Sequence, residues 1–157
     1  MSRTGTSPRI AAASTAALLA ALTLALAGPG IAAPVAPKKG TYKGKTSQRS
    51  VNASFRQIEF KVNGKRTRIT LTVEPVVARN FCVSAPVFLA EGSSVSTKLR
   101  HGRFAFTETF VGSKFHRIAG RFVAPDEIEG EATYWFAESD AGLCGAGSTT
   151  TKFSAEK

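Results

Sequence analysis

Glu129, Glu131 and Trp135 are the residues whose types and spacing best fit a chemical site. Their positions differ by even numbers, so on a β-strand all three side chains share one face. Paired carboxylates beside an aromatic ring are found in many carbohydrate sites, and an exposed Trp135 would serve as a stacking platform. The alternative interpretation is an ordinary solvent face whose acids complement basic residues of the chain, with Trp135 covered by a second layer.

A basic segment indicates a different kind of site, one that contacts anions. The chain has a net charge of +10, and residues 34–79 hold eleven Lys and Arg against two acids. Residues 80–157 hold eight Lys and Arg against nine acids. Such a concentration of positive charge favours contact with an anionic partner, either a cell-envelope polymer or lipid headgroups. The alternative interpretation is a sheet face that is simply solvated. The candidate anion-binding residues are Lys43, Lys45, Arg56, Lys61, Lys65, Arg66 and Arg68.

Most other functions lack their characteristic motifs. Single-stranded nucleic acid is recognised by cations interleaved with stacking aromatics, and on the polar face of the basic segment only Phe55 shares the parity of the cations. The chain has no G-x-S-x-G, H-E-x-x-H, phosphate-loop or dinucleotide-binding pattern. His101 and His116 have cationic neighbours and no evident nucleophile beside them. We therefore assign no catalytic residue, metal or cofactor, and do not expect nucleic acid as a partner.

The two cysteines, Cys82 and Cys144, predict one disulfide bond. In an exported domain of this size a pair of thiols is most simply a cross-link. Closing a loop of about 60 residues would stabilise the fold by roughly 4 kcal/mol in the chain-entropy model. A metal site would need histidines or further cysteines at ligand spacing, and a catalytic thiol would leave the second cysteine without a role.

The first residues have the pattern of a secretory signal peptide. Arg3 and Arg9 precede an uncharged stretch over residues 10–27, which ends in Ala-Leu-Ala and is followed by Gly-Pro-Gly. This order predicts cleavage after Ala27, with an alternative cut after Ala32, and a secreted or extracytoplasmic location by the general secretory route. A retained membrane anchor is the competing interpretation. Residues 28–39, rich in Pro, Ala and Gly, then form a disordered lead-in, and residues 40–157 form a single β domain.

Short runs of Phe, Val, Ile and Thr, broken by Gly, Asn and Asp, predict an antiparallel all-β fold for that domain. The connections are short, which favours a meander closed as a β-sandwich or a small barrel of about eight or nine strands. The expected strands lie at residues 40–46, 55–62, 65–73, 87–89, 102–110, 118–122, 128–136 and 149–154.

The strongest local pattern is a hairpin around Asn63-Gly64. A type I′ turn at these two residues would place Val62 opposite Lys65 and Phe60 opposite Thr67, with Glu59 and Lys61 paired to Arg68 and Arg66 on the other face. The side chains expected on the core face are Ile58, Phe60, Val62, Ile69, Leu71 and Val73.

These features together resemble a group of small exported bacterial β-rich proteins of uncharacterised function. The matching residues are the opening Gly40-Thr41-Tyr42, the Asn-Gly hairpin, the strand Ile118–Phe122 and the late Cys144-Gly145-Ala146-Gly147. The resemblance implies secretion and a β fold and carries no activity. We therefore expect a monomeric, non-enzymatic binding or surface-associated module whose basic hairpin contacts an anionic partner. The alternatives are a small carbohydrate-active or hydrolytic enzyme and an exported inhibitor.

Overall fold

The structure, a computed structural model, describes residues 34–157 apart from residues 50, 80–81, 85–87, 91, 111–113 and 138–144. These residues belong to one compact unit, Pro34–Lys157. The predicted signal peptide over residues 1–27 and the start of the predicted lead-in lie outside the described residues.

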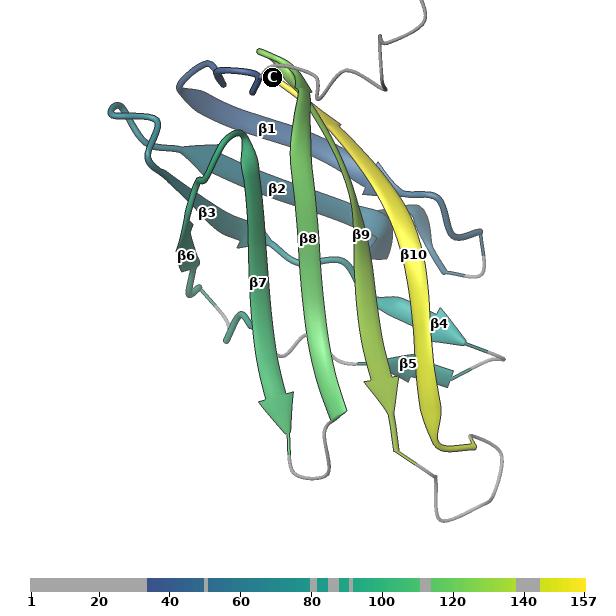
Figure 1. Ribbon diagram of the computed structural model, residues 1–157. Helices are drawn as coiled ribbons and strands as arrows, with labels where there is room; N and C mark the ends of the chain where they lie inside the picture. The colour runs from purple at the N-terminus through teal and green to yellow at the C-terminus, as the bar shows by residue number, and fades with distance from the viewer. Residues whose placement is uncertain are drawn as a thin grey trace, which may run out of the picture. The chain divides into compact units, whose positions relative to one another are not determined.

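Strands make up almost all of the regular structure in the described part of the chain, together with one 3₁₀ helix, η1 (Ala53–Arg56). The strands, labelled in Figure 1, are β1 (Gly40–Thr46), β2 (Gln57–Val62), β3 (Arg68–Val73), β4 (Val77–Arg79), β5 (Cys82–Ser84), β6 (Val95–Lys98), β7 (Arg103–Phe110), β8 (Lys114–Ala124), β9 (Glu127–Phe136) and β10 (Gly147–Glu156).

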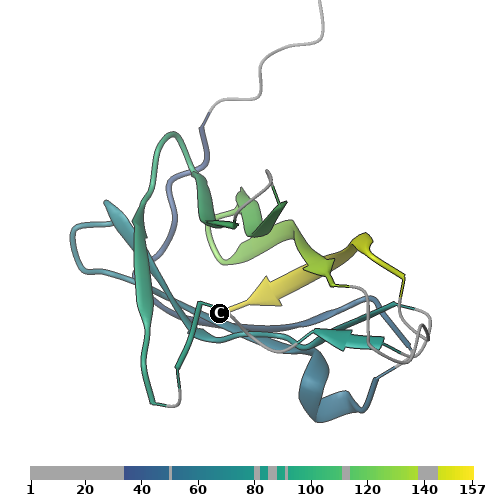
Figure 2. The ribbon, with the colours of Figure 1, turned by 90° about the horizontal axis from the view of Figure 1, so that it is seen from below.

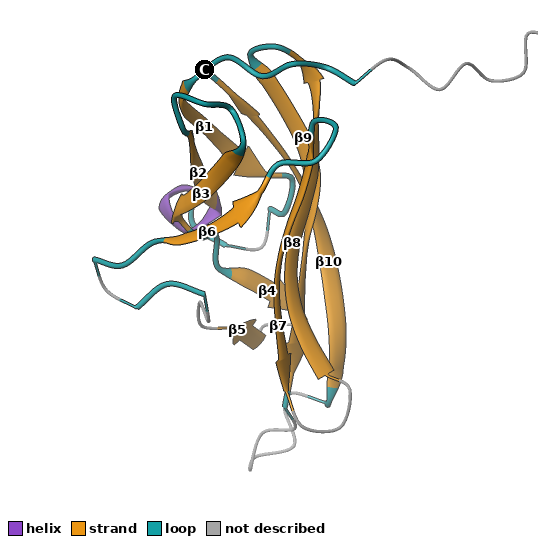
Figure 3. Ribbon diagram, turned by 60° about the vertical axis from the view of Figure 1, so that its left-hand side comes forward, coloured by secondary structure: helices purple, strands orange, loops and turns teal. Residues whose placement is uncertain are grey.

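Eight strands form one antiparallel sheet in the order β6-β3-β2-β1-β10-β9-β8-β7, and β4 and β5 form a separate pair. β1 pairs with both β2 and β10, so the first and last strands lie side by side. The two ends of the sheet, β6 and β7, contact each other, and the sheet curls into a nearly closed barrel. Figures 2 and 3 show β1–β3 on the opposite side of the interior from β8–β10. The prediction of an antiparallel all-β fold is therefore confirmed, and the sheet approaches a barrel.

Alternating inward side chains from both halves of the sheet fill the barrel. Phe60 is central, with its ring centroid 5.2 Å from that of Phe104 and 5.5 Å from that of Phe153. Such edge and tilted arrangements are favoured between aromatic rings. The buried apolar residues are Tyr42, Ile58, Phe60, Val62, Ile69, Leu71, Val77, Cys82, Phe104, Phe106, Ile118, Phe122, Ile128, Ala132, Tyr134, Phe136, Phe153 and Ala155.

The predicted hairpin forms between β2 and β3, but its turn and register differ from the prediction. Neither Asn63 nor Gly64 has a positive φ, so no type I′ turn forms there. Instead the Asn63 side-chain oxygen accepts from the N–H groups of Thr67 (2.9 Å) and Arg68 (3.2 Å). This longer loop places Val62 opposite Ile69, four residues beyond the predicted partner.

A register shift by an even number of residues leaves each side chain on the same face of the sheet, so most of the side chains predicted to face the core do so. Ile58, Phe60, Val62, Ile69 and Leu71 are all buried. Val73 is 36% exposed, because a bulge pairs it with Glu59 on the outer face. The predicted pairs of Glu59 with Arg68 and Lys61 with Arg66 are absent, since Glu59 faces Val73 and Lys61 faces Thr70.

Other strand boundaries also differ from the expectation. The predicted strand over residues 55–62 begins as η1, and the structure adds β4, β5 and β6, none of which was predicted. Of the expected piece over residues 87–89, residue 87 lies outside the described residues, and Phe88 and Leu89 are not in a strand. The missed strands have only three or four residues each, too short for alternation to be recognised.

Residues 34–39 belong to the same compact unit as the strands, Pro34–Lys157, and contact them. Lys38 forms an ion pair with Asp126 (2.7 Å), and its backbone N–H donates to the Pro125 carbonyl (2.7 Å). The hydroxyl of Tyr42 donates to the Lys38 carbonyl (2.6 Å) and lies 2.9 Å from the Pro125 carbonyl. The hydrogen bond and charge of Lys38 hold the pKa of Asp126 below its usual value.

Tyr134 and Glu74 form a hydrogen-bonded pair near the place where β4 and β5 contact β9. The hydroxyl of Tyr134, which is fully buried, donates to the Glu74 carboxylate (2.5 Å). The other oxygen of that carboxylate accepts from the N–H groups of Phe88 and Leu89, each at 3.2 Å. Glu74 therefore ties the segment around residues 88–89 to the interior of β9.

Candidate anion-binding site

Five cations lie next to one another across the strands on the outer surface. We call Arg68, Lys98, Arg100, Arg103 and Arg121 the basic belt. Arg68 on β3 faces Lys98 on β6, Arg100 faces Arg103 on β7, and Arg103 faces Arg121 on β8. All five are exposed, and residues directly opposite in an antiparallel pair project from the same face.

A tight turn joins the two halves of the basic belt. His101 and Gly102 have positive φ values of 50° and 72°, as a type I′ turn requires at both central positions. The N–H groups of Arg100 and Arg103 each donate to the other's carbonyl at 2.9 Å. The type I′ turn expected at Asn63-Gly64 thus occurs at His101-Gly102, where it places Arg100 beside Arg103.

The basic belt carries like charges in direct opposition. Three of its neighbouring pairs consist of two cations, an arrangement that destabilises a sheet. The ion pairs among the described residues are Lys38–Asp126 and Lys43–Glu59, so none neutralises a member of the basic belt. The opposed cations therefore lower the stability of the sheet, and such a loss of stability is common at binding sites.

Beyond Arg121 the same cross-strand row continues with mixed charge. Arg121 faces Glu129 on β9, Glu129 faces Ser154 on β10, and Ser154 faces Lys45 on β1. The row therefore joins cations, a carboxylate and a hydroxyl from strands that are far apart in the sequence.

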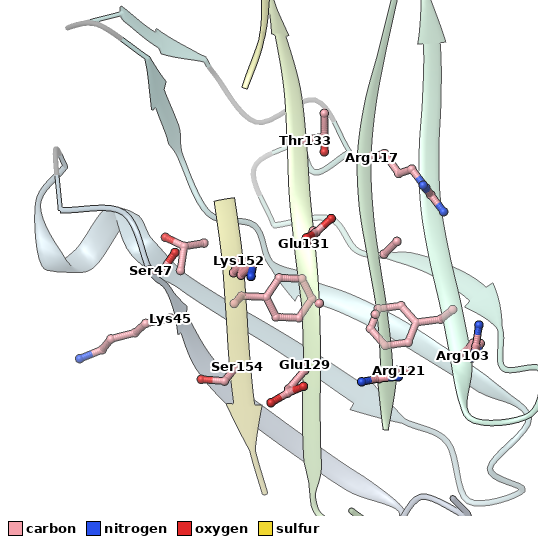
Figure 4. Close-up of a pocket in the computed structure, with 16 residues that line it drawn as sticks. Lys45, Ser47, Arg103, Arg117, Arg121, Glu129, Glu131, Thr133, Lys152 and Ser154 are labelled. Atoms are coloured by element: carbon pink, nitrogen blue, oxygen red, sulfur yellow. The ribbon is translucent and has the colours of Figure 1, made fainter. Parts of the chain in front are cut away.

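An open groove of about 940 Å³ lies over this part of the sheet. Its charged residues are five cations and two acids, so the groove is basic overall. Figure 4 shows them over β7–β10 and the adjoining end of β1. The lining side chains with a polar group are Lys45, Thr46, Ser47, Arg103, Arg117, Arg121, Glu129, Glu131, Thr133, Lys152 and Ser154.

Two glycines shape the sheet beneath the groove. Gly120 and Gly130 lie opposite each other on β8 and β9, and the rings of Phe104 and Phe153 fill the space that their side chains would occupy. Both rings also line the groove, although they are only 5% and 4% exposed.

A smaller hollow of about 480 Å³ lies at the seam between β6 and β7. Its charged lining residues are Lys98, Arg100, Arg103 and Arg117, with no acid among them. The hollow shares Arg103, Phe104 and Arg117 with the larger groove. The basic belt and the groove thus form one continuous surface centred on Arg103.

The predicted carbohydrate-contact residues are only partly brought together. Glu129 and Glu131 both line the groove, and no hydrogen bond or ion pair joins either side chain to another residue within the described part of the chain. Trp135 is on the same face of β9 but is partly buried and does not line the groove. It is thus neither fully covered nor a freely exposed stacking platform.

The predicted anion-binding residues are dispersed. Lys45 lines the groove, and Arg68 belongs to the basic belt. Lys43 lies 3.5 Å from Glu59. Arg56, in η1, donates to the Gln48 carbonyl (3.0 Å) and has its Nε atom buried. The remaining three, Lys61, Lys65 and Arg66, are exposed on β2 and in the loop that follows it.

Sequence reasoning missed the cations at the centre of the site. Arg100, Arg103, Arg117 and Arg121 lie in the half of the chain that has slightly more acids than bases, so the charge count hid them. Arg117 and Arg121 do share strand parity, which was a usable signal. Shared parity within one strand does not predict how β6, β7 and β8 lie beside one another, and it is this arrangement that brings the cations together.

Cys82 is buried on β5, with 8% of its surface exposed, and no free cysteine occurs among the described residues. Cys144 lies outside the described residues, so the Cys82–Cys144 disulfide stays a prediction. Within the same residues there is no cluster of three or more potential metal ligands, and no helix is long and apolar enough to cross a membrane.

Comparisons with protein families, with curated proteins and with solved structures gave no match.

Proposed function

We propose that this protein is an exported, non-enzymatic binding module whose basic belt and adjoining groove hold an extended polyanion. The observation that carries the proposal is the direct opposition of cations in three neighbouring cross-strand positions. Like charges opposite one another destabilise the sheet in isolation, whereas a bound polyanion neutralises them all at once.

The geometry suits a chain-like partner better than a small ion. The row of exposed cations crosses β3, β6, β7 and β8. The paired strands β3 and β6, and likewise β7 and β8, lie about 4.8 Å apart. Arginine predominates, and its planar guanidinium binds carboxylate and phosphate groups with two parallel hydrogen bonds. An anionic cell-envelope polymer is the partner that agrees with export.

Export itself is supported by the sequence pattern of residues 1–27. A Cys82–Cys144 disulfide would agree with an oxidising compartment and would anchor β5 to the segment before β10. We propose both as parts of the same account.

The test is retention of the mature, oxidised protein on immobilised polyanions over a salt gradient. The belt variant combines Lys98→Gln, Arg103→Gln and Arg121→Gln. The control variant combines Lys39→Gln, Arg49→Gln and Lys61→Gln, three exposed cations outside the basic belt. Both variants lose three positive charges, so they have the same net charge and differ in where the charge is removed.

The proposal expects tight retention of the native protein that weakens steeply with salt, because release of condensed counterions drives such binding. The belt variant should elute at clearly lower salt than the control variant. Equal elution of the two variants would show that net charge alone retains the protein and would contradict an organised site.

A carbohydrate-active enzyme is the second candidate, because Glu129 and Glu131 share the groove. They leave one strand on the same face two residues apart, whereas the acids of a glycosidase flank the scissile bond from opposite sides. Release of reducing ends from acidic and neutral polysaccharides distinguishes the two, since the binding module releases none.

A further inference from the structure

The two carboxylates of the groove are unexpected in a site for a simple polyanion. Glu129 directly faces Arg121, and Glu131 directly faces Lys152, yet neither carboxylate forms an ion pair with any described residue. Each is exposed and lines the same groove as five cations. A ligand bearing only negative charge would be repelled at these two positions.

Carboxylates accept hydrogen bonds and cannot donate them, so a ligand that lies against Glu129 and Glu131 must present donors. Groups in the same groove must also satisfy Arg103, Arg117 and Arg121, which only donate. A chain that alternates anionic groups with hydroxyls meets both requirements. Hydroxyl side chains of Ser47, Thr133 and Ser154 along the groove can donate or accept and add to such a match.

Building on the function proposed above, we infer that the ligand of the groove is an acidic polysaccharide, whose carboxylates bind the arginines while its hydroxyls donate to Glu129 and Glu131. Single-stranded nucleic acid fits less well, because the groove offers no exposed aromatic side chain for bases to stack on, its two rings being nearly buried. Charge complementarity alone would not separate these ligands. The unpaired carboxylates argue against a polyanion without hydrogen-bond donors, and the lack of an exposed ring in the groove argues against nucleic acid.

The test uses two probes with the same charged group. Polygalacturonate carries carboxylates and hydroxyls, and polyacrylate carries carboxylates alone. Binding of the mature protein to each is measured at one ionic strength for the native form and for the double variant Glu129→Gln and Glu131→Gln. The matched control is Glu127→Gln with Glu156→Gln, two acids that pair where β9 begins and β10 ends and do not line the groove.

The expected results have opposite signs for the two probes. The groove variant should bind polygalacturonate about tenfold more weakly, because each lost hydrogen bond to a charged acceptor weakens binding. It should bind polyacrylate at least as tightly as the native protein, because two repelling charges are gone. The control variant should bind both probes as the native protein does, or slightly tighter.

Tighter binding of the groove variant to both probes would overturn the inference and leave a general polyanion site in place. If instead the native protein bound neither probe in a salt-dependent way, the proposed function itself would fail. The two failures are therefore distinguishable in one set of titrations.

Discussion

Arg103 on β7 lies directly opposite Arg121 on β8, and both side chains are exposed on the same face of the sheet. On its other side Arg103 faces Arg100 across the His101-Gly102 turn. One arginine is thus flanked by two others in direct cross-strand positions. A sheet selected only for stability would not keep this arrangement, and it forms the centre of the surface to which we assign polyanion binding.

Replacing Arg103 with glutamate should stabilise the free protein. Two like-charge pairs become opposite-charge pairs, which should raise the free energy of unfolding by about 1 kcal/mol at low salt, and by less as salt screens the charges. Urea denaturation at low and high ionic strength measures the change. Lys61→Glu is the control, because Lys61 faces Thr41 and Thr70 rather than cations. A destabilised Arg103→Glu variant would contradict the interpretation of the basic belt.

Gly130→Ala should strongly destabilise the barrel. A methyl group at this position would overlap the Ala119 carbonyl and the ring of Phe153, and overpacking of this kind costs about 1–3 kcal/mol. Gly64→Ala serves as the control, since nothing lies within 4 Å of its added carbon. The midpoints of urea denaturation should therefore fall for Gly130→Ala and stay nearly unchanged for Gly64→Ala.

The sequence was most informative where one local rule decided the structure. Alternation alone identified the inward residues of β2 and most of those of β3, because an even shift in register moves no side chain to the other face. It could not locate the turn. The Asn63 side chain satisfies the N–H groups of Thr67 and Arg68, and this hydrogen bonding overrides the preference of Asn-Gly for a two-residue turn.

Predicting the candidate site required knowing which strands lie beside one another, and local sequence patterns do not give this. Glu129 and Glu131 were found because they are close in the sequence and share parity. Of the basic belt only Arg68 was predicted, because Arg68, Lys98 and Arg121 become neighbours only through the order of strands in the curled sheet. Short strands such as β6 give too little periodicity to predict that order.

The stability of the protein should fall as the pH is lowered below about 6.5, and His116 should contribute to the fall. Burial lowers the pKa of His116 from 6.5, more than its bond to the Trp135 carbonyl (3.0 Å) and the charge of Glu108 raise it. Between the ordinary pKa and the lowered one, the unfolded chain binds a proton that the folded chain does not. Acid therefore favours unfolding over this range.

The free energy of unfolding, measured from pH 8 down to about pH 5, should fall less steeply in His116→Gln than in the native protein. His101→Asn is the matched control, because His101 is exposed in a turn whose positive φ asparagine tolerates. It should keep the native slope. An unchanged slope in His116→Gln would show that this side chain does not titrate on unfolding.

Reduction of the predicted Cys82–Cys144 bond should destabilise the domain without changing its fold. The expected loss is up to about 4 kcal/mol, as the chain-entropy model gives for a loop of about 60 residues. Peptide mapping of the exported protein with and without reductant identifies the bond, and urea denaturation under both conditions measures its effect. Two free thiols in the exported protein would contradict the prediction.

The most direct test of the central claim is to map the surface that a polyanion contacts. Backbone amide shifts of the isotopically labelled mature protein are followed while polygalacturonate is added. We predict that the largest changes cluster at residues 98–103 and around Arg121 and Glu129. Changes centred on the loop around Lys65 and Arg66, or spread evenly over all exposed cations, would contradict the account.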